Sequence, residues 1–323
     1  MKRKIRSSSH SWVYAIWGVN FAVIICLLGA AIFYLNSQRA SAANASVGTP
    51  SAAPTQIAPP TIYFLPTLTP NPYSTLPVFE TSTPFILENG QGSTVIGLSN
   101  GGRPIEVYTF GSGKYEYLIV AGIHGGSEWN TIALANELIR YVNDHPDIIP
   151  SNAKLYIIRN MNPDGEARSH DVDGRVNNRG VDLNRNFPTE NWVADWNRDG
   201  CWVWRETTGG AYGGSEPETR SVMGFIGSHS IQAVISYHSA ALGVFPGGVP
   251  WEPDSIRLAK ALSKATGYPY PPIDTGCDYT GTLADWAVEN GVGAAVDMEL
   301  TDHKNTDFKQ NLEALKVLLN FVP

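Results

Sequence analysis

The sequence predicts an α/β domain with a mixed, largely parallel sheet flanked by helices, preceded by a transmembrane helix and a disordered stalk. Strand-like and helix-like segments alternate from about residue 85 to the C-terminus, which is typical of α/β folds. An uncharged apolar run lies near the N-terminus, and a proline-rich segment follows it. We therefore expect a basic tail (1–10), a membrane anchor (11–35), a stalk (36–84) and a folded domain (85–323).

The N-terminal segment has the features of a membrane anchor. Residues 11–35 contain no charged side chain, and about 20 apolar residues cross a bilayer. Lys2, Arg3, Lys4 and Arg6 precede this run and favour a cytoplasmic N-terminus, so the rest of the chain is expected outside the cytoplasm. The run is long for a signal-peptide core, which favours an uncleaved anchor. Small residues at 41–45 leave open a cleaved signal and a secreted protein.

Residues 36–84 have the composition of a linker. Arg39 and Glu80 are the segment's two charged residues, and nine prolines lie between Pro50 and Pro84. Such a segment buries too little apolar surface to offset the entropy lost on ordering. We expect an extended, semi-stiff stalk that holds the folded domain away from a membrane.

The folded domain contains four strand-like runs and four helix-like segments. The strand-like runs are Tyr115–Ile123, Lys154–Ile158, Gln232–Tyr237 and Gly293–Met298. The helix-like segments are Thr131–Val142, Ser255–Thr266, Thr282–Asn290 and Asp307–Phe321. Their alternation predicts parallel strands joined by helices.

Charge and cysteine content exclude some classes of protein. The net charge is −7 although the first six residues carry four positive charges, so the body of the chain is acidic and unsuited to nucleic acid. Cys26, Cys201 and Cys277 include no CxxC pair, which argues against a cysteine-ligated metal. Cys201 and Cys277 are either a disulfide pair in an oxidising compartment or two free thiols.

Three apolar runs are followed by side chains suited to catalysis: His124, His238 and Glu299. Ligands of open α/β sheets bind beyond the carboxyl ends of strands, so we expect these three side chains to converge. His124 and Glu128 lie close together in a glycine-containing segment, and with His238 they provide three zinc ligands. A fourth position then stays open for water, as in catalytic zinc sites.

A polar segment also stands out between residues 162 and 187. It contains Asn-Pro-Asp-Gly at 162–165, which alone indicates only a turn, and the more specific string Gly-Val-Asp-Leu-Asn-Arg-Asn-Phe at 180–187. Its arginines are suited to binding a carboxylate through two parallel hydrogen bonds.

Together these motifs resemble those of the zinc carboxypeptidase family, which includes pancreatic carboxypeptidases and bacterial peptidoglycan amidases. The resemblance runs from Ile123 to Leu300 and rests on His124, Glu128, 162–165, Arg175, 180–187, Ser-Tyr-His-Ser at 236–239, and Glu299. It implies the family's α/β fold, with a mixed sheet flanked by helices, and one zinc ion per chain.

The resemblance also implies a role for each matching residue. It implies zinc ligands at His124, Glu128 and His238, an oxyanion-stabilising Arg175, a carboxylate-binding pair Asn184 and Arg185, a general base and acid at Glu299, and a carboxylate at Asp182 that orients His124. Tyr279 is the best match for a substrate-capping tyrosine and is equally compatible with packing. Asp297 is the next candidate for the base.

The chain departs from the family at its first motif. The family usually spaces the first His and Glu as HxxE, but Ser127 lies three residues after His124 and Glu128 lies four after it. Either Gly125 and Gly126 absorb one extra residue, or metal binding is impaired. The uncharged Ala284, in a segment that resembles the floor of the family's substrate pocket, argues weakly against basic terminal residues.

We therefore expect a membrane-anchored zinc carboxypeptidase that acts on peptides or peptidoglycan stem peptides outside the cytoplasm. Two alternatives remain at this stage: a deacylase of N-acylated amino acids on a related fold, and a catalytically inactive binding module. An internal ion pair of Arg185 with Asp182 or Asp195 would argue against the carboxypeptidase.

Overall fold

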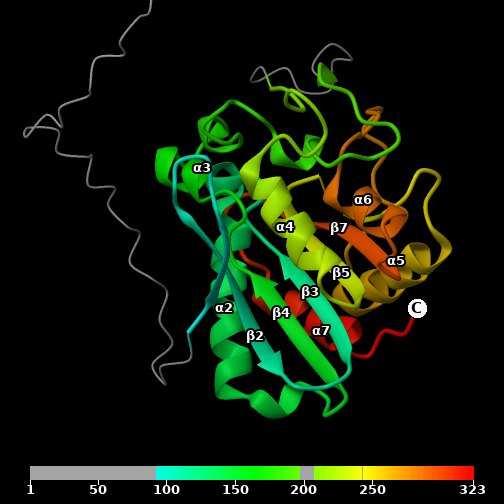
Figure 1. The fold of residues 1–323 in the computed structure, drawn as a ribbon. Helices are drawn as coiled ribbons and strands as arrows, with labels where there is room; N and C mark the ends of the chain where they lie inside the picture. Colours follow the sequence, from blue (N-terminus) through cyan, green and yellow to red (C-terminus); the bar gives the residue numbers. More distant parts are fainter. Residues whose placement is uncertain (1–91, 197–206, 242) are drawn as a thin grey trace, which may run out of the picture. The chain divides into compact units, whose positions relative to one another are not determined.

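A mixed sheet runs through the part of the chain that the structure, a computed structural model, describes: residues 92–196, 207–241 and 243–323 (Figure 1). All of these residues belong to one unit, Pro77–Pro323. The predicted basic tail, anchor and stalk (1–84) lie outside the described residues and stay predictions. Within the described ranges, no helix has the length and apolar character needed to cross a membrane.

The described residues form seven strands and six α-helices. The strands are β1 (Thr94–Leu98), β2 (Pro104–Gly111), β3 (Tyr115–Val120), β4 (Ala153–Ile158), β5 (Ile231–Ser239), β6 (Gly243–Pro246) and β7 (Ala294–Leu300). The helices are α2 (Trp129–Asp144), α3 (Pro163–Arg168), α4 (Pro217–Gly227), α5 (Pro253–Thr266), α6 (Leu283–Glu289) and α7 (Phe308–Leu319). Four short 3₁₀ turns lie between them: η1 (Gly125–Glu128), η2 (Pro146–Ile148), η3 (Val172–Gly174) and η4 (Leu183–Arg185).

The sheet has the strand order β1-β2-β4-β3-β5-β7-β6. Its centre, β4-β3-β5-β7, is parallel, whereas β1 and β2 on one side and β6 on the other pair antiparallel. The predicted mixed sheet flanked by helices is therefore confirmed, with the parallel pairing confined to the central four strands.

Both faces of the sheet are covered, which explains the continuous apolar runs in the sequence. Successive strand residues point to opposite faces. Tyr117 and Ile119 of β3 pack in one core with α2, α5 and α7, while Leu118 and Val120 pack in a second core with α4 and α6.

The four predicted strands correspond to β3, β4, β5 and β7, and the four predicted helices to α2, α5, α6 and α7. Strands β1, β2 and β6 and helices α3 and α4 were not predicted. Strand β6 has only four residues, and β2 alternates buried and exposed positions over a short span, so neither produces a long apolar run.

Candidate active site

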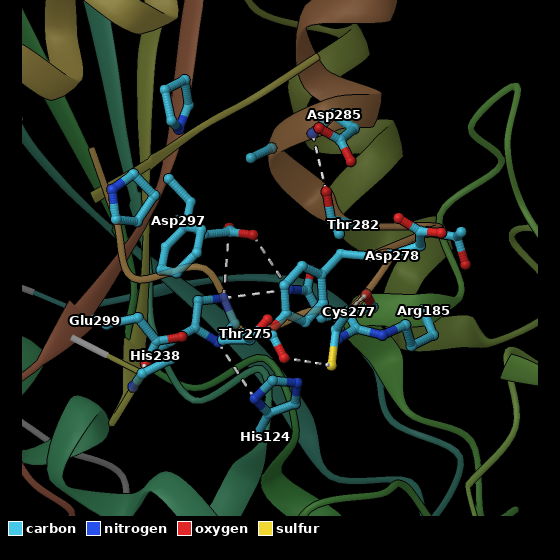
Figure 2. A pocket seen from close by; sticks show the side chains of 18 of the residues that line it. His124, Arg185, His238, Thr275, Cys277, Asp278, Thr282, Asp285, Asp297 and Glu299 are labelled. Atoms are coloured by element: carbon cyan, nitrogen blue, oxygen red, sulfur yellow. Dashed lines mark hydrogen bonds and ion pairs between the residues drawn. The ribbon is translucent and has the colours of Figure 1, made fainter. Parts of the chain in front are cut away.

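The site lies at the carboxyl ends of the parallel strands, where His124, His238 and Glu299 converge as expected (Figure 2). His124 follows β3 after a short loop, and His238 and Glu299 lie opposite each other in the register of β5 and β7. All three line one cavity of about 790 Å³. The parallel pairing of β3, β5 and β7 thus brings together residues that are far apart in the sequence.

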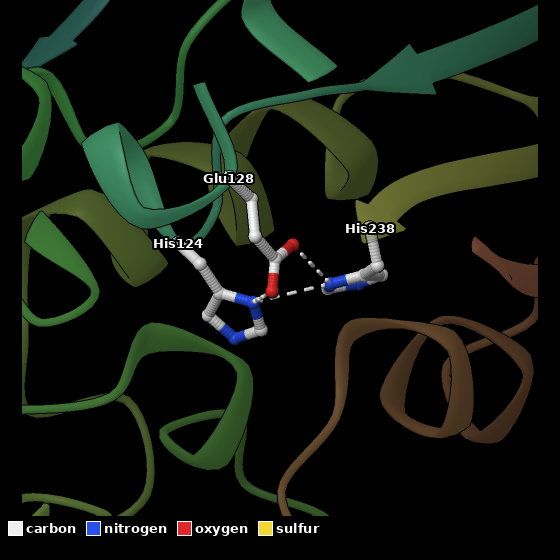
Figure 3. Close-up of side chains that lie close together, drawn as sticks. All are labelled: His124, Glu128 and His238. Carbon is white, nitrogen blue, oxygen red and sulfur yellow. Dashed lines mark hydrogen bonds and ion pairs between the residues drawn. The ribbon is translucent and has the colours of Figure 1, made fainter. Parts of the chain in front are cut away.

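His124, Glu128 and His238 form a compact set of buried donor atoms (Figure 3). His124 Nδ1 lies 2.7 Å from Glu128 Oε1. His238 Nδ1 lies 3.3 Å from Glu128 Oε2 and 3.3 Å from His124 Nδ1. Within the described ranges, this is the one group of three or more His, Cys, Asp or Glu side chains close enough to share a metal ion.

The structure explains how the longer spacing from His124 to Glu128 still forms this group. Residues 125–128 make the 3₁₀ turn η1, which directs Glu128 back toward His124 and leaves Ser127 outside the donor set. Gly125 has a φ of 45°, and a Cβ at Gly126 would collide with the backbone carbonyl of Ser169. Both positions therefore require glycine, and Gly125 and Gly126 accommodate the extra residue.

The donor set suits zinc. Two imidazole nitrogens and a carboxylate are a common zinc ligand set, and ligands about 2.0–2.2 Å from a tetrahedral zinc lie roughly 3.3 Å apart. Burial raises the pKa of Glu128, but the neighbouring His124 and His238 outweigh this effect and hold its pKa well below its usual range. The carboxylate is thus ionised, as a metal ligand must be.

Neighbouring polar groups fix the orientation of both imidazoles. His124 Nε2 lies 3.2 Å from Asp182 Oδ1, as the resemblance implied, and Arg175 Nε donates to Asp182 Oδ2 at 2.9 Å. Asp182 is fully buried, yet Arg175 and His124 hold its pKa well below its usual range despite that burial. Such partners keep a ligand imidazole in one tautomer and one orientation.

On the other side, His238 Nε2 lies 3.0 Å from Ser236 Oγ, 3.3 Å from Asn184 Nδ2 and 3.4 Å from Asp297 Oδ1. Each imidazole therefore turns Nδ1 toward the other ligand atoms and Nε2 toward a supporting group.

Arg175 and Glu299 both line the cavity. Arg175 Nη1 lies 3.3 Å from Glu128 Oε1, and the residue is 4% exposed. Glu299 Oε2 accepts a hydrogen bond from the Ala241 amide at 2.9 Å. Burial raises the pKa of Glu299 to about 7, with His238 opposing this shift and the negative charge of Glu128 adding to it. A carboxyl group with such a pKa is suited to both accepting and releasing a proton near neutral pH.

Arg185 is a buried cation at the wall of the cavity. Its guanidinium lies 4.2 Å from the centre of the Trp196 ring and 5.0 Å from that of Tyr279, and its Nη1 donates to the Asn184 carbonyl at 2.5 Å. In the described part of the chain, its Nε has no hydrogen-bond partner and its guanidinium forms no ion pair, including with Asp182 or Asp195. The internal pairing considered from the sequence is therefore not observed in this part of the chain.

Asn184 and Tyr279 complete the wall around Arg185. Asn184 Oδ1 accepts from the Leu283 amide at 2.8 Å, which holds the side chain against the start of α6. The Tyr279 hydroxyl lies 2.8 Å from Thr275 Oγ1, and its ring lines the cavity. Tyr279 thus packs on Arg185 while remaining beside the cavity.

Several lining residues were not given a role from the sequence, among them Asp285, Trp196 and His303; Asp297 was named there only as a substitute base. One signal was available for Asp297: it is a charged residue inside an otherwise apolar strand, two positions before Glu299 and so on the same side of β7. Trp196 gave no such signal, because its role depends on its approach to Arg185.

Cys277 also lines the cavity and is disulfide-bonded. Its partner lies outside the described residues, as do both candidates, Cys26 and Cys201. Of the two alternatives left open by the sequence, free thiols are wrong for Cys277.

A parallel-centred α/β sheet with a buried His-Glu-His set and a glutamate of raised pKa at its carboxyl edge defines a zinc hydrolase of the carboxypeptidase type. Comparison with known families agrees: residues 92–316 match the zinc carboxypeptidase family model. The chain belongs to the zinc carboxypeptidase family, whose members use zinc, and the expected family, hydrolase class and cofactor are confirmed.

The curated relatives include both a carboxypeptidase and a murein peptide amidase. The chain is 30% identical to carboxypeptidase A1 of Rattus norvegicus over 240 residues, covering 64% of this chain and 56% of the relative. It is 29% identical to murein peptide amidase A of Escherichia coli (strain K12) over 184 residues, covering 53% of this chain and 66% of the relative. The chain thus spans about half the length of the carboxypeptidase A1 relatives.

Solved structures show the same fold. Bovine thrombin-activatable fibrinolysis inhibitor, in complex with tick carboxypeptidase inhibitor, has a TM-score of 0.59 at 22% identity, covering 70% of this chain and 88% of that one. Murein-tripeptide amidase from Escherichia coli O157 has a TM-score of 0.55 at 24% identity, covering 72% and 93%.

Proposed function

We propose that this protein is a zinc-dependent carboxypeptidase that hydrolyses the C-terminal amide bond of peptides or peptidoglycan stem peptides. The observation that carries the proposal is Arg185, a buried guanidinium that has no ion pair among the described residues and borders the same cavity as His124, Glu128 and His238. A buried charge without a counter-charge is costly. A substrate carboxylate bound beside the metal would provide that counter-charge.

The reaction assigns a separate task to each group. A bound zinc supplies Lewis acidity and a water that ionises near neutral pH. Glu299 takes a proton at Oε1, because the Ala241 amide already occupies Oε2, and then passes it to the leaving amine. Arg175 stabilises the negative charge that develops on the carbonyl oxygen, since its guanidinium is already fixed by Asp182 and Glu128.

Substrate binding falls to the opposite wall of the cavity. Arg185 and Asn184 hold the terminal carboxylate, and the rings of Trp196 and Tyr279 keep the guanidinium in place. Tyr279 closes over the bound residue. This arrangement requires a free C-terminus, which makes the enzyme an exopeptidase. Similarity to murein peptide amidase A supports peptidoglycan stem peptides as one substrate class.

We also propose that residues 11–35 anchor the protein in a membrane and that residues 36–84 hold the catalytic domain outside the cytoplasm. The basic N-terminus before an uncharged 25-residue run supports this topology. The disulfide at Cys277 supports an oxidising compartment.

Of the two alternatives from the sequence, the inactive binding module now has less support, and the deacylase has to be separated by experiment. The inactive binding module rested on the displaced Glu128, and Glu128 lies among the ligand atoms. A deacylase of N-acylated amino acids also binds a free carboxylate, so the length of the substrate separates it from a carboxypeptidase.

The proposal is tested by digesting a peptide library with the zinc-loaded full-length chain and reading the products by mass spectrometry. We expect removal of single C-terminal residues and resistance of C-terminally amidated peptides. Glu299→Gln should keep fold and zinc but lose at least 10²- to 10⁴-fold in rate, the usual contribution of a general base. Internal cleavage, or cleavage of N-acylated amino acids alone, would contradict the carboxypeptidase assignment.

A further inference from the structure

The part of the cavity beyond the metal site is negatively charged. Asp297 of β7 and Asp285 of α6 line it (Figure 2), and so do the exposed Asp274 and Asp278. Among the described residues, the arginines that line it are Arg175, which pairs with Asp182 and Glu128, and Arg185. The carboxylates outside the metal set therefore outnumber the cations that remain to balance them.

Asp297 lines the cavity and contacts both His238 and Asn184. Its buried Oδ1 atom has no hydrogen-bond partner among the described residues and forms an ion pair with His238 Nε2 at 3.4 Å. Its Oδ2 atom lies 3.4 Å from Asn184 Nδ2, and Phe245 of β6 faces it across the strand pair. The side chain is 14% exposed, so it reaches the cavity while most of it is shielded from water.

Binding of substrate makes the imbalance larger. The substrate's terminal carboxylate neutralises Arg185. Asp297 then remains as a largely buried carboxylate beside the side chain of the bound residue, together with the 7% exposed Asp285. A cation on that side chain would remove the cost of the uncompensated charge.

Resting on the carboxypeptidase proposed above, we infer that the cavity selects a terminal residue whose side chain carries an ammonium or guanidinium group, with Asp297 as its principal partner and Asp285 beside it. Burial, and then the charge of Asp297, raise the pKa of Asp285 to about 6, in agreement with a region of negative potential that lacks a cation. From the sequence, the uncharged Ala284 argued weakly against basic terminal residues, but Ala284 is only one lining position. The negative charges of the cavity come from its neighbour Asp285 and from Asp297 of β7.

The inference is tested by comparing kcat/KM of the zinc-loaded full-length chain for N-acylated tripeptides that end in lysine, norleucine or glutamate. Norleucine has nearly the length of lysine without its charge. We expect lysine to exceed norleucine by about 10- to 100-fold, the range of a charge-assisted hydrogen bond, and glutamate to react slowest. Asp297→Asn should lower the lysine-to-norleucine ratio by a similar factor. Glu313→Gln, which removes a charge from the exposed face of α7, serves as the control.

Zinc content is measured first for each variant, because Asp297 also lies near His238. Equal reaction of lysine and norleucine peptides in the unaltered protein overturns the inference. An Asp297→Asn variant whose kcat/KM falls equally for both substrates also overturns the inference, since that result would make Asp297 a positioning residue for His238. If no peptide is cleaved, the proposed function fails, and calorimetry still tests the cavity: preferential binding of lysine-ended peptides supports the inference, and equal or absent binding overturns it.

Discussion

Replacing Arg185 by methionine gives the most direct test of exopeptidase action. The guanidinium is 4% exposed, has no ion pair among the described residues and packs against Trp196 and Tyr279, so its position is fixed before substrate binds. Two charge-assisted hydrogen bonds to a carboxylate contribute about 1.5–3 kcal/mol each, or about 3–6 kcal/mol together. Arg185→Met should therefore lower kcat/KM for a free-acid peptide by roughly 10²- to 10⁴-fold.

The assay uses two N-acylated peptides that differ only in a free or an amidated C-terminus. Arg185→Met should affect the amide by less than about tenfold, because the amide cannot form the paired ionic contact. Arg185→Lys keeps the charge but cannot form two parallel hydrogen bonds. Its kcat/KM for the free-acid peptide should therefore lie between those of the unaltered protein and Arg185→Met. Thermal unfolding of each variant controls for a folding defect, which would depress both substrates alike. Equal rates for acid and amide in the unaltered protein would refute the reasoning.

Three further predictions concern the metal, the base and the topology. Glu128→Ala should lose most bound zinc while Ser127→Ala keeps about one zinc per chain by metal analysis; the reverse result would restore the usual HxxE register. Because Glu299 must be deprotonated to act as a base, kcat/KM should fall as pH drops through its pKa, which is about 7 before the positive charge of zinc lowers it. This fall in kcat/KM at low pH should be missing from the residual activity of Glu299→Gln. If it persists, the titrating group is another residue. Protease added to intact cells, once any outer layer is removed, should release an active fragment cut within residues 36–84, whereas release only after lysis would contradict the topology.

The sequence predicted the centre of the fold better than its edges. Strands β3, β4, β5 and β7 are buried on both faces and so appear as apolar runs, whereas the short edge strand β6 does not. His124, His238 and Glu299 were identifiable because each stands at the end of such a run. Glu128 was also predicted as a ligand, but only the backbone of η1 shows how it, rather than Ser127, reaches the other ligands.

Other parts of the site depend on contacts that no local pattern encodes. The packing of Trp196 on Arg185 joins residues from an irregular segment, and no periodicity marks either position. Ala284 argued against a preference for basic terminal residues, whereas Asp297 argues for it, and this difference has the same origin. A pocket is lined by several elements at once, so the charge at one sequence position does not give the charge of the cavity.

The register that sets His238 against Glu299 has a consequence for how this enzyme can change. Both residues lie on hydrogen-bonded neighbouring strands, so backbone pairing, and not a loop, sets the spacing between them. Substitutions in α6 or in the loop after β6 can therefore remodel the pocket while that spacing is preserved. Asp297 is the exception, because it shares β7 with Glu299 and approaches His238. Changing the substrate preference by substituting Asp297 would therefore put turnover at risk. Substituting Asp285 would change the preference while turnover is preserved.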